Sequence, residues 1–245
     1  MKQSIFTILA NTALTDSVYK MVLAGDTSAI TAPGQFVNIR LTGKFLRRPI
    51  SVCDCDGETL TIIYKVVGSG TEILSRMVSR EELDILTDLG NGYDLTPAGD
   101  SPVLLGGGVG VPPLYRLAKE LLAMGKQVTV ILGFNTKSEV FYESEFRALG
   151  CRVIVTTADG SCGVRGFATT PLEALDYTYF YACGPEPMLK AVYGFTRTSG
   201  QMSFEERMGC GFGACMGCSC KTLTGYKRIC KDGPVMKKEE ILWEA

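Results

Sequence analysis

The sequence predicts a multidomain protein with three parts: an antiparallel β-barrel over residues 1–98, a parallel α/β domain over 99–200 and a small module over 201–245. Three observations predict this division. Short apolar alternations separated by turn residues fill the first part, strand-like and helix-like stretches alternate in the second, and half of the ten cysteines fall in the last. A chain of 245 residues is long enough for two compact domains and an appendage.

Composition excludes several classes of function. Apolar residues make up 46% and charged residues 21% of the chain, as in ordinary globular proteins. A net charge of −1 offers no basic surface for nucleic acid, and no apolar run reaches the roughly eighteen residues that span a bilayer. The first ten residues alternate like a strand and do not resemble a signal peptide. Ten cysteines without an export signal predict metal ligation in the reducing cytoplasm.

The first part is predicted to be all-β. Apolar alternation with a period of two predicts strands at 4–9, 18–23, 36–41, 50–53 and 60–67, with Gly, Pro and Asp turns between them. Strands of this length and spacing are typical of a small barrel.

Two places in this barrel suggest a ligand. Arg48 starts a strand in the run Arg48-Pro49-Ile50-Ser51, and Gly70-Thr71 opens a predicted helix, where free N–H groups and the helix dipole favour an anion. Each alone is more often a feature of local structure, a solvated strand end or an ordinary helix entry, than a binding site. Together they fit a dinucleotide with its pyrophosphate between Arg48 and Gly70-Thr71, and with the Ser51 hydroxyl beside a flavin ring.

The second part is predicted to form a parallel sheet. Strands are expected at 101–105, 127–132, 151–156 and 177–182, with helices at 114–124, 139–149 and 171–176. Ligands of such sheets bind at the carboxyl ends of the strands, where glycine-bearing loops fall at 106–110, 159–161 and 183–186. The first loop departs from G-x-G-x-x-G because Val111 replaces the third glycine, so by itself it fits a dinucleotide or a plain tight turn.

The last part carries four regularly spaced cysteines, Cys210, Cys215, Cys218 and Cys230. Their C-x4-C-x2-C opening matches the plant-type 2Fe-2S pattern, although the fourth cysteine lies closer than usual in that pattern. Interspersed glycines suit a loop that turns sharply around a cluster. A structural zinc ion and cysteines without a metal are the alternatives, and Cys220 is treated as a spare.

The chain contains no histidine. This excludes Rieske ligation, histidine-containing zinc sites and an imidazole general base. Any enzymatic chemistry must therefore depend on cofactors.

Three features in this order resemble the ferredoxin-reductase-type flavoproteins, and among them the electron-transfer subunits of NAD-dependent (class B) dihydroorotate dehydrogenase. The features are Arg48-Pro-Ile-Ser51, the glycine loop with Cys183-Gly-Pro-Glu-Pro-Met188, and Glu206-Arg-Met-Gly-Cys-Gly-Phe-Gly-Ala-Cys215. The resemblance covers essentially the whole chain and implies a ferredoxin-reductase-like fold.

The resemblance also implies sites and partners. FAD would bind at Arg48, Pro49, Ile50, Ser51, Ile63, Tyr64, Lys65, Gly70 and Thr71. NAD would bind at Gly107, Gly108, Gly110, Cys183, Gly184 and Pro185. The partner would be an FMN-containing catalytic subunit, in a heterotetramer of two plus two, with electrons passing from dihydroorotate through FMN, the cluster and FAD to NAD+. No residue of this chain is expected to be catalytic in the acid–base sense.

Several alternatives stay open at this point. The same architecture resembles the small subunits of sulfhydrogenases and of ferredoxin-dependent NAD(P)H transhydrogenases, and a zinc-stabilised binding module without redox activity is a more remote interpretation. Lys137 and Arg152 could serve the 2′-phosphate of NADP. Cys183 is either near the flavin or simply a small buried residue at a strand end.

Overall fold

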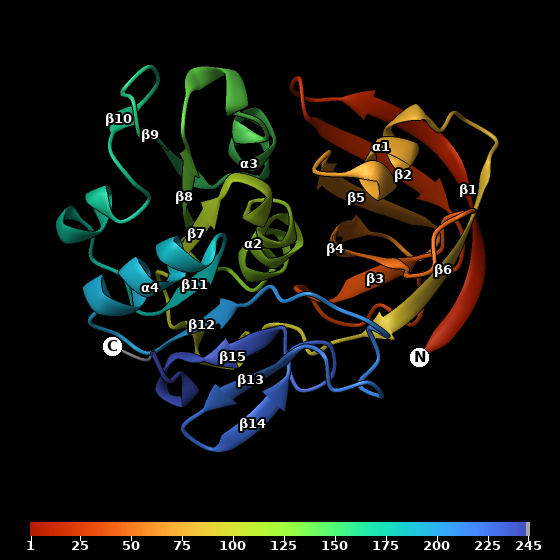
Figure 1. Cartoon of the computed structure of the whole chain (residues 1–245). Helices are drawn as coiled ribbons and strands as arrows, with labels where there is room; N and C mark the ends of the chain where they lie inside the picture. Colours follow the sequence, from red (N-terminus) through yellow and green to blue (C-terminus); the bar gives the residue numbers. More distant parts are fainter. Residues whose placement is uncertain (244–245) are drawn as a thin grey trace.

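A computed structural model describes residues 1–243 and shows a barrel beside an α/β sheet, with a small C-terminal hairpin against the edge of that sheet (Figure 1). Six antiparallel strands close the barrel in the order β1-β2-β5-β4-β3-β6. Their bounds are β1 Lys2–Ala13, β2 Val18–Ala24, β3 Phe36–Ile39, β4 Arg48–Cys55, β5 Thr59–Lys65 and β6 Glu82–Leu89. The prediction of an antiparallel barrel is confirmed.

Strand β6 was not predicted, yet it closes the barrel by pairing with both β1 and β3. Its sequence Glu-Leu-Asp-Ile-Leu-Thr-Asp-Leu contains the alternation of a strand, but two adjacent apolar residues interrupt it. Inside the barrel Val37 and Ile39 join one apolar cluster, while Phe36 joins a cluster outside it. Because side chains alternate along a strand, the outer face of β3 carries Phe36 and Asn38.

The second sheet has seven strands in the order β10-β9-β8-β7-β11-β12-β15. The bounds are β7 Val103–Gly107, β8 Thr129–Phe134, β9 Arg152–Thr157, β10 Val164–Arg165, β11 Phe180–Cys183, β12 Gly200–Ser203 and β15 Val235–Lys237. All neighbouring pairs are parallel except β12 with β15. The prediction of a parallel sheet is therefore confirmed, with one antiparallel strand added at its edge.

Two of the predicted helices differ from those in the structure. The predicted helix at 171–176 is a 3-10 helix, η4 (Thr170–Ala174), with a proline at its start. The predicted helix at 139–149 divides into η3 (Lys137–Glu139) and α3 (Glu143–Leu149), because Tyr142 between them has φ +66° and interrupts the helix. The remaining helices are α1 (Ser69–Arg76), α2 (Pro113–Ala123) and the unpredicted α4 (Glu186–Phe195), with short 3-10 turns η1 (Thr96–Ala98), η2 (Gly108–Gly110) and η5 (Lys238–Glu240).

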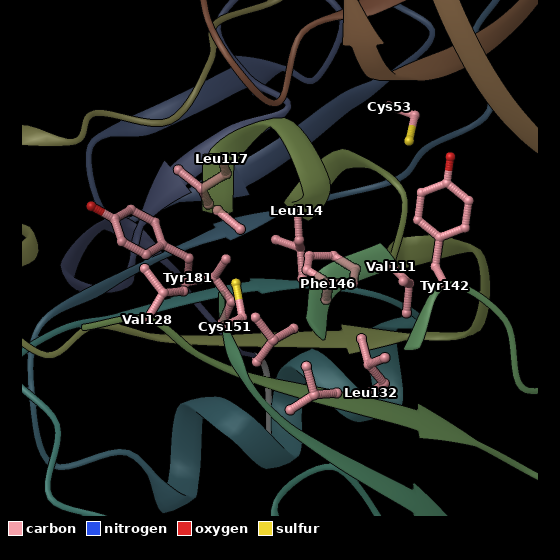
Figure 2. Packing of buried hydrophobic residues seen from close by; sticks show 14 of the residues in the cluster. Cys53, Val111, Leu114, Leu117, Val128, Leu132, Tyr142, Phe146, Cys151 and Tyr181 are labelled. Carbon is pink, nitrogen blue, oxygen red and sulfur yellow. The ribbon is translucent and has the colours of Figure 1, made fainter. Parts of the chain in front are cut away.

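Each face of the α/β sheet packs into its own apolar core, and the two cores include different neighbouring parts of the chain. Leu104 packs with α2, α3 and the barrel residue Cys53, and Figure 2 shows the hydroxyl of Tyr142 beside the Cys53 sulfur. On the other face, Val103 packs in a cluster that also contains Phe36 of the barrel and Cys230 of the C-terminal module. Apolar packing therefore joins all three parts of the chain.

The C-terminal part forms a hairpin of β13 (Ser219–Thr222) and β14 (Gly225–Arg228) before β15 joins the α/β sheet. The predicted boundaries at 98 and 200 stay a prediction. Within residues 1–243, every helix is too short or too polar to cross a membrane.

Candidate functional site

Arg48 lies directly on the first turn of α1. A Cβ atom added to Gly70 would come within 2.1 Å of Arg48 Nε, so the guanidinium packs against this turn at a distance that any side chain at position 70 would disturb. The helix begins with Ser69 and Gly70, whose N–H groups have no helical acceptor. A guanidinium and a helix N-terminus thus meet at one point, which is the arrangement that a pyrophosphate requires.

The neighbouring Arg47 has a different role. Its guanidinium donates to the backbone oxygens of Asn38 at 3.3 Å and Asp84 at 2.9 Å, and forms an ion pair with the Asp84 carboxylate at 3.0 Å. Arg47 therefore ties β3 to β6. Of the two adjacent cations, only Arg48 lies at the predicted anion site.

Thr71 holds the turn that opens α1. Its hydroxyl accepts from the N–H groups of Val67 at 3.0 Å and Gly68 at 3.3 Å, and donates to the Gly68 carbonyl at 3.1 Å. These bonds keep the Gly68-Ser69-Gly70 turn in place. Direct contact of Thr71 with a cofactor stays a prediction.

The other predicted flavin residues lie on β4 and β5, where their side chains point in two directions. Ser51 lies opposite Phe36 and Pro49 opposite Asn38, all outside the barrel by strand alternation, whereas Ile50 packs against the barrel interior. Ile63 packs against the α/β core, whereas Tyr64 belongs to the barrel interior and donates its hydroxyl to Asn11 Oδ1 at 3.0 Å. Lys65 borders a small cavity that Gly108 also lines, so it faces the α/β domain.

The two segments predicted to bind the nicotinamide nucleotide are in contact. Strands β7 and β11 are neighbours, and Gly106 pairs with Cys183. A Cβ added to Gly110 would lie 2.2 Å from the Cys183 carbonyl oxygen, and one added to Gly107 would lie 2.5 Å from Met188 Sδ. The glycine loop therefore packs backbone to backbone on the turn formed by Cys183, Gly184 and Pro185, at the carboxyl edge of the sheet.

Cys183 ends β11 and remains a neutral thiol. Burial raises its pKa to about 12, although a hydrogen bond with Ser203 acts in the opposite direction. It is neither an activated nucleophile nor an acid at neutral pH.

The two cations considered for a 2′-phosphate lie at opposite edges of the sheet. Arg152 is the first residue of β9, away from the glycine loops. Lys137 lies beyond the end of β8, where its N–H donates to the Ser161 hydroxyl at 2.8 Å, and Ser161 in turn donates to Asp159 at 2.6 Å. An acidic side chain therefore shares the edge with Lys137.

The four spaced cysteines form two pairs. The N–H of Cys210 points at Cys215 Sγ and that of Cys215 at Cys210 Sγ, while the N–H of Cys230 points at Cys218 Sγ. Ala214 and Gly217 direct further N–H groups at Cys210 Sγ and Cys215 Sγ, at 3.2 and 3.5 Å. Sulfurs surrounded by N–H donors are typical of iron–sulfur ligation.

The loop reaches this geometry through glycines. Gly211 has φ +78° and Gly213 has φ +90°, a conformation that favours glycine. Cys215 is exposed whereas Cys218 and Cys230 are buried, so one pair lies nearer to solvent. Cys220, on β13, lies in a partly buried position against the apolar cluster.

The thiol pKa values differ between the two cysteine pairs. Burial tends to raise the pKa of Cys210, but backbone N–H groups of Phe212, Cys215 and Ala214 outweigh it and lower the pKa to about 6. Burial raises the pKa of Cys230 to about 12, and the neighbouring Cys218 adds to the effect. Metal ligation removes such thiol protons.

The donor set fits a two-iron cluster. In 2Fe-2S proteins four cysteines serve two irons, so two pairs are required. Among residues 1–243, no three His, Cys, Asp or Glu side chains are placed as ligands of one metal ion. The assignment of Cys210, Cys215, Cys218 and Cys230 as ligands stays a prediction that this pairing supports.

Two residues that hold the cysteine loop were missed from the sequence. Asn38 Nδ2 donates to the Cys210 carbonyl at 3.1 Å, and Arg228 donates to the Gly213 carbonyl at 2.9 Å while pairing with Asp232 at 3.0 Å. An asparagine inside the apolar run Phe-Val-Asn-Ile is unusual in a strand, and that was the available signal.

Comparison with known proteins identifies two family regions. Residues 205–242 match the family described as the iron-sulfur cluster binding domain of dihydroorotate dehydrogenase B, and residues 104–193 match the oxidoreductase NAD-binding domain.

Curated relatives match along the full length. The chain is 43% identical to the dihydroorotate dehydrogenase B (NAD(+)) electron transfer subunit of Geobacillus sp. (strain WCH70), covering 99% of both chains. It is 42% identical to the protein of the same name from Fusobacterium nucleatum, covering 98% of this chain and 99% of that one.

Solved structures agree on the fold. A structure of an NADH-dependent reduced ferredoxin-NADP oxidoreductase is 29% identical with a TM-score of 0.89, covering 98% of this chain and 90% of that one. A ferredoxin NADP+ reductase from Neisseria gonorrhoeae is 19% identical with a TM-score of 0.70, covering 80% and 90%. The prediction of a ferredoxin-reductase-like fold is thus confirmed.

Proposed function

We infer the function from the premise that this chain belongs to the family of dihydroorotate dehydrogenase B (NAD(+)) electron transfer subunits. The protein is an oxidoreductase subunit that passes electrons from a dihydroorotate-oxidising catalytic subunit to NAD+, as a step of pyrimidine biosynthesis. The observation that carries this proposal is the two-pair arrangement of the cysteines beside the outer face of β3 and β4, where Pro49 and Ser51 lie; we call this face the flavin face.

FAD, a 2Fe-2S cluster and NAD are the cofactors of this function. When bound, FAD would exchange a hydride equivalent with the nicotinamide and single electrons with the cluster. Arg48 and the α1 N-terminus at Gly70 would hold the FAD pyrophosphate, and the Ser51 hydroxyl would lie on the flavin side. The loop of Gly107, Gly108 and Gly110, with Cys183, Gly184 and Pro185, would hold the nicotinamide nucleotide. Asp159 favours NAD over NADP, because a carboxylate repels a 2′-phosphate.

The partner is an FMN-containing catalytic subunit, in a heterotetramer of two plus two, and the complex lies in the cytoplasm. The family name supports a separate catalytic partner. The cysteines support a reducing compartment, since none of the ten forms a disulfide.

Anaerobic co-expression with an FMN-binding barrel subunit tests the proposal. The purified complex should contain iron, acid-labile sulfide, FAD and FMN, and should form orotate with NAD+. Cys215→Ser should lose the cluster and NAD-linked orotate formation, while NADH-dependent dye reduction through FAD persists. Full NAD-linked turnover in this variant would contradict the proposal. Co-purification with an iron–sulfur-rich large subunit would instead favour the alternative role, as the small subunit of a sulfhydrogenase or of a ferredoxin-dependent NAD(P)H transhydrogenase.

A further inference from the structure

Asn38 connects the barrel to the backbone of a predicted cluster ligand through a side-chain hydrogen bond. It is 1% exposed on β3, and its Nδ2 donates to the carbonyl of Cys210 at 3.1 Å. The contact joins residues 172 positions apart in the chain. The loop packs directly on this amide, because a Cβ added to Gly211 would come within 2.2 Å of Nδ2.

The outer face of β3 and β4, on which Asn38 lies, also carries two of the predicted flavin-binding residues. Asn38 pairs with Pro49 and Phe36 with Ser51 across β3 and β4, so Asn38 is the neighbour of the segment that resembles a flavin-binding motif. Phe36 belongs to the apolar cluster that contains Cys218 and Cys230. The outer face of β3 therefore adjoins the flavin segment and is linked to both cysteine pairs, to Cys210 by the Asn38 amide and to Cys218 and Cys230 through the cluster that Phe36 joins.

The position of Asn38 is fixed. Its backbone carbonyl accepts from Arg47 at 3.3 Å, and Arg47 is held in turn by the Asp84 carboxylate at 3.0 Å. Because its backbone is held in this way, the Asn38 side-chain amide fixes the position of the Cys210 carbonyl to which it donates.

Stability alone does not explain this asparagine. Among residues 1–243 its Oδ1 finds no hydrogen-bond partner although it is buried. An unpaired buried acceptor is destabilising, and an apolar side chain of similar size would avoid that cost. The amide is thus placed for the contact with Cys210 and not for a satisfied polar network.

We propose that Asn38 is the positioning residue that sets the cluster loop at a fixed separation from the flavin face and so governs electron transfer between the two. The inference rests on the proposed function. Outer-shell partners of metal ligands act in this way, and their loss typically reduces activity by roughly 10- to 100-fold.

The test uses the full chain in its complex, with FAD and cluster bound, and the variants Asn38→Leu and Asn38→Ala. NADH is mixed anaerobically with each protein, and flavin reduction is followed by absorbance and cluster reduction by rapid-freeze electron paramagnetic resonance. Flavin reduction, FAD content and iron content should stay within about twofold of wild type, whereas cluster reduction should slow by about tenfold or more. The resonance spectrum of the reduced cluster should also shift, and the melting temperature should fall little or rise.

Asn91→Ala is the matched control, because Asn91 Nδ2 donates to the Asp232 carbonyl of the same module at 3.1 Å without touching a flavin strand. It should leave cluster reduction unchanged. Cluster reduction at the wild-type rate in both Asn38 variants would overturn the inference while leaving the proposed function intact, and so would equal slowing in Asn91→Ala. A wild-type complex without iron would refute the proposed function itself.

Discussion

Replacing Gly110 by alanine should disrupt the nicotinamide site through a steric effect alone. The φ of Gly110 is outside the left-handed region, so alanine is compatible with the backbone. The added methyl group, however, would lie 2.2 Å from the carbonyl oxygen of Cys183, 2.4 Å from its carbonyl carbon and 2.6 Å from the nitrogen of Gly184. These are backbone atoms of the neighbouring strand end, which cannot rotate away.

The size of the effect follows from these distances. Ordinary contact begins at 3.4 Å, so the turn at Cys183-Gly184 must move by about 1 Å. Overpacking of this kind costs about 1–3 kcal/mol of unfolding free energy, and each kcal/mol lowers the melting temperature of a chain of this size by about 2–4 °C. A displacement of about 1 Å in a reacting complex can reduce the rate about 100-fold.

The assay is anaerobic stopped-flow reduction of the bound flavin over a series of NADH concentrations, combined with thermal unfolding. Gly110→Ala should reduce the second-order rate with NADH by at least about tenfold, while dithionite reduces the flavin normally. Gly125→Ala is the control, since Gly125 follows the end of α2 outside the proposed sites, with φ +77° and no atom within 4 Å of an added Cβ. It should lose about 1–2 kcal/mol of stability through backbone strain only. Wild-type NADH kinetics in Gly110→Ala would refute the reasoning.

Three further predictions concern the anion site, the helix α4 and the cysteine loop. Arg48→Gln should raise the dissociation constant for FAD by about 10- to 100-fold, the contribution of one charged hydrogen bond, while the iron content stays unchanged. Equilibrium titration of the apoprotein with FAD measures this constant, and an unchanged value would contradict the prediction. Gly194→Ala should raise the unfolding free energy by about 0.5–1 kcal/mol in a denaturant titration, because Gly194 is helical and an added Cβ has no atom within 4 Å; a loss of stability would contradict this. In the iron-free chain, alkylation of Cys210 should accelerate as pH rises through about 6, because the thiolate is the reactive form. Cys183, with its pKa of about 12, should stay unmodified below pH 9. Mass spectrometry of peptides measures the two rates separately, and equal rates would be inconsistent with the hydrogen bonds to Cys210.

The sequence by itself determined the local elements and the chemistry of the cysteines. Apolar periodicity located five barrel strands and the strands β7, β8, β9 and β11 of the parallel sheet, because side-chain alternation is a local property. The spacing from Cys210 to Cys230 indicated the kind of metal site. Elements with interrupted patterns were missed. The alternation of β6 is broken by the adjacent apolar residues Ile85 and Leu86, and α4 follows directly on a glycine-proline turn that predicts a loop.

Only the tertiary structure decided which residues meet. Arg47 and Arg48 are equivalent in sequence, yet one clamps β3 to β6 and the other lies on α1. Asn38 gained its significance only when Cys210 was placed against it, and Gly110 when Cys183 was. Each of these contacts joins distant segments through strand pairing and barrel closure, and such long-range geometry depends on the whole chain and leaves no periodic signal in the sequence.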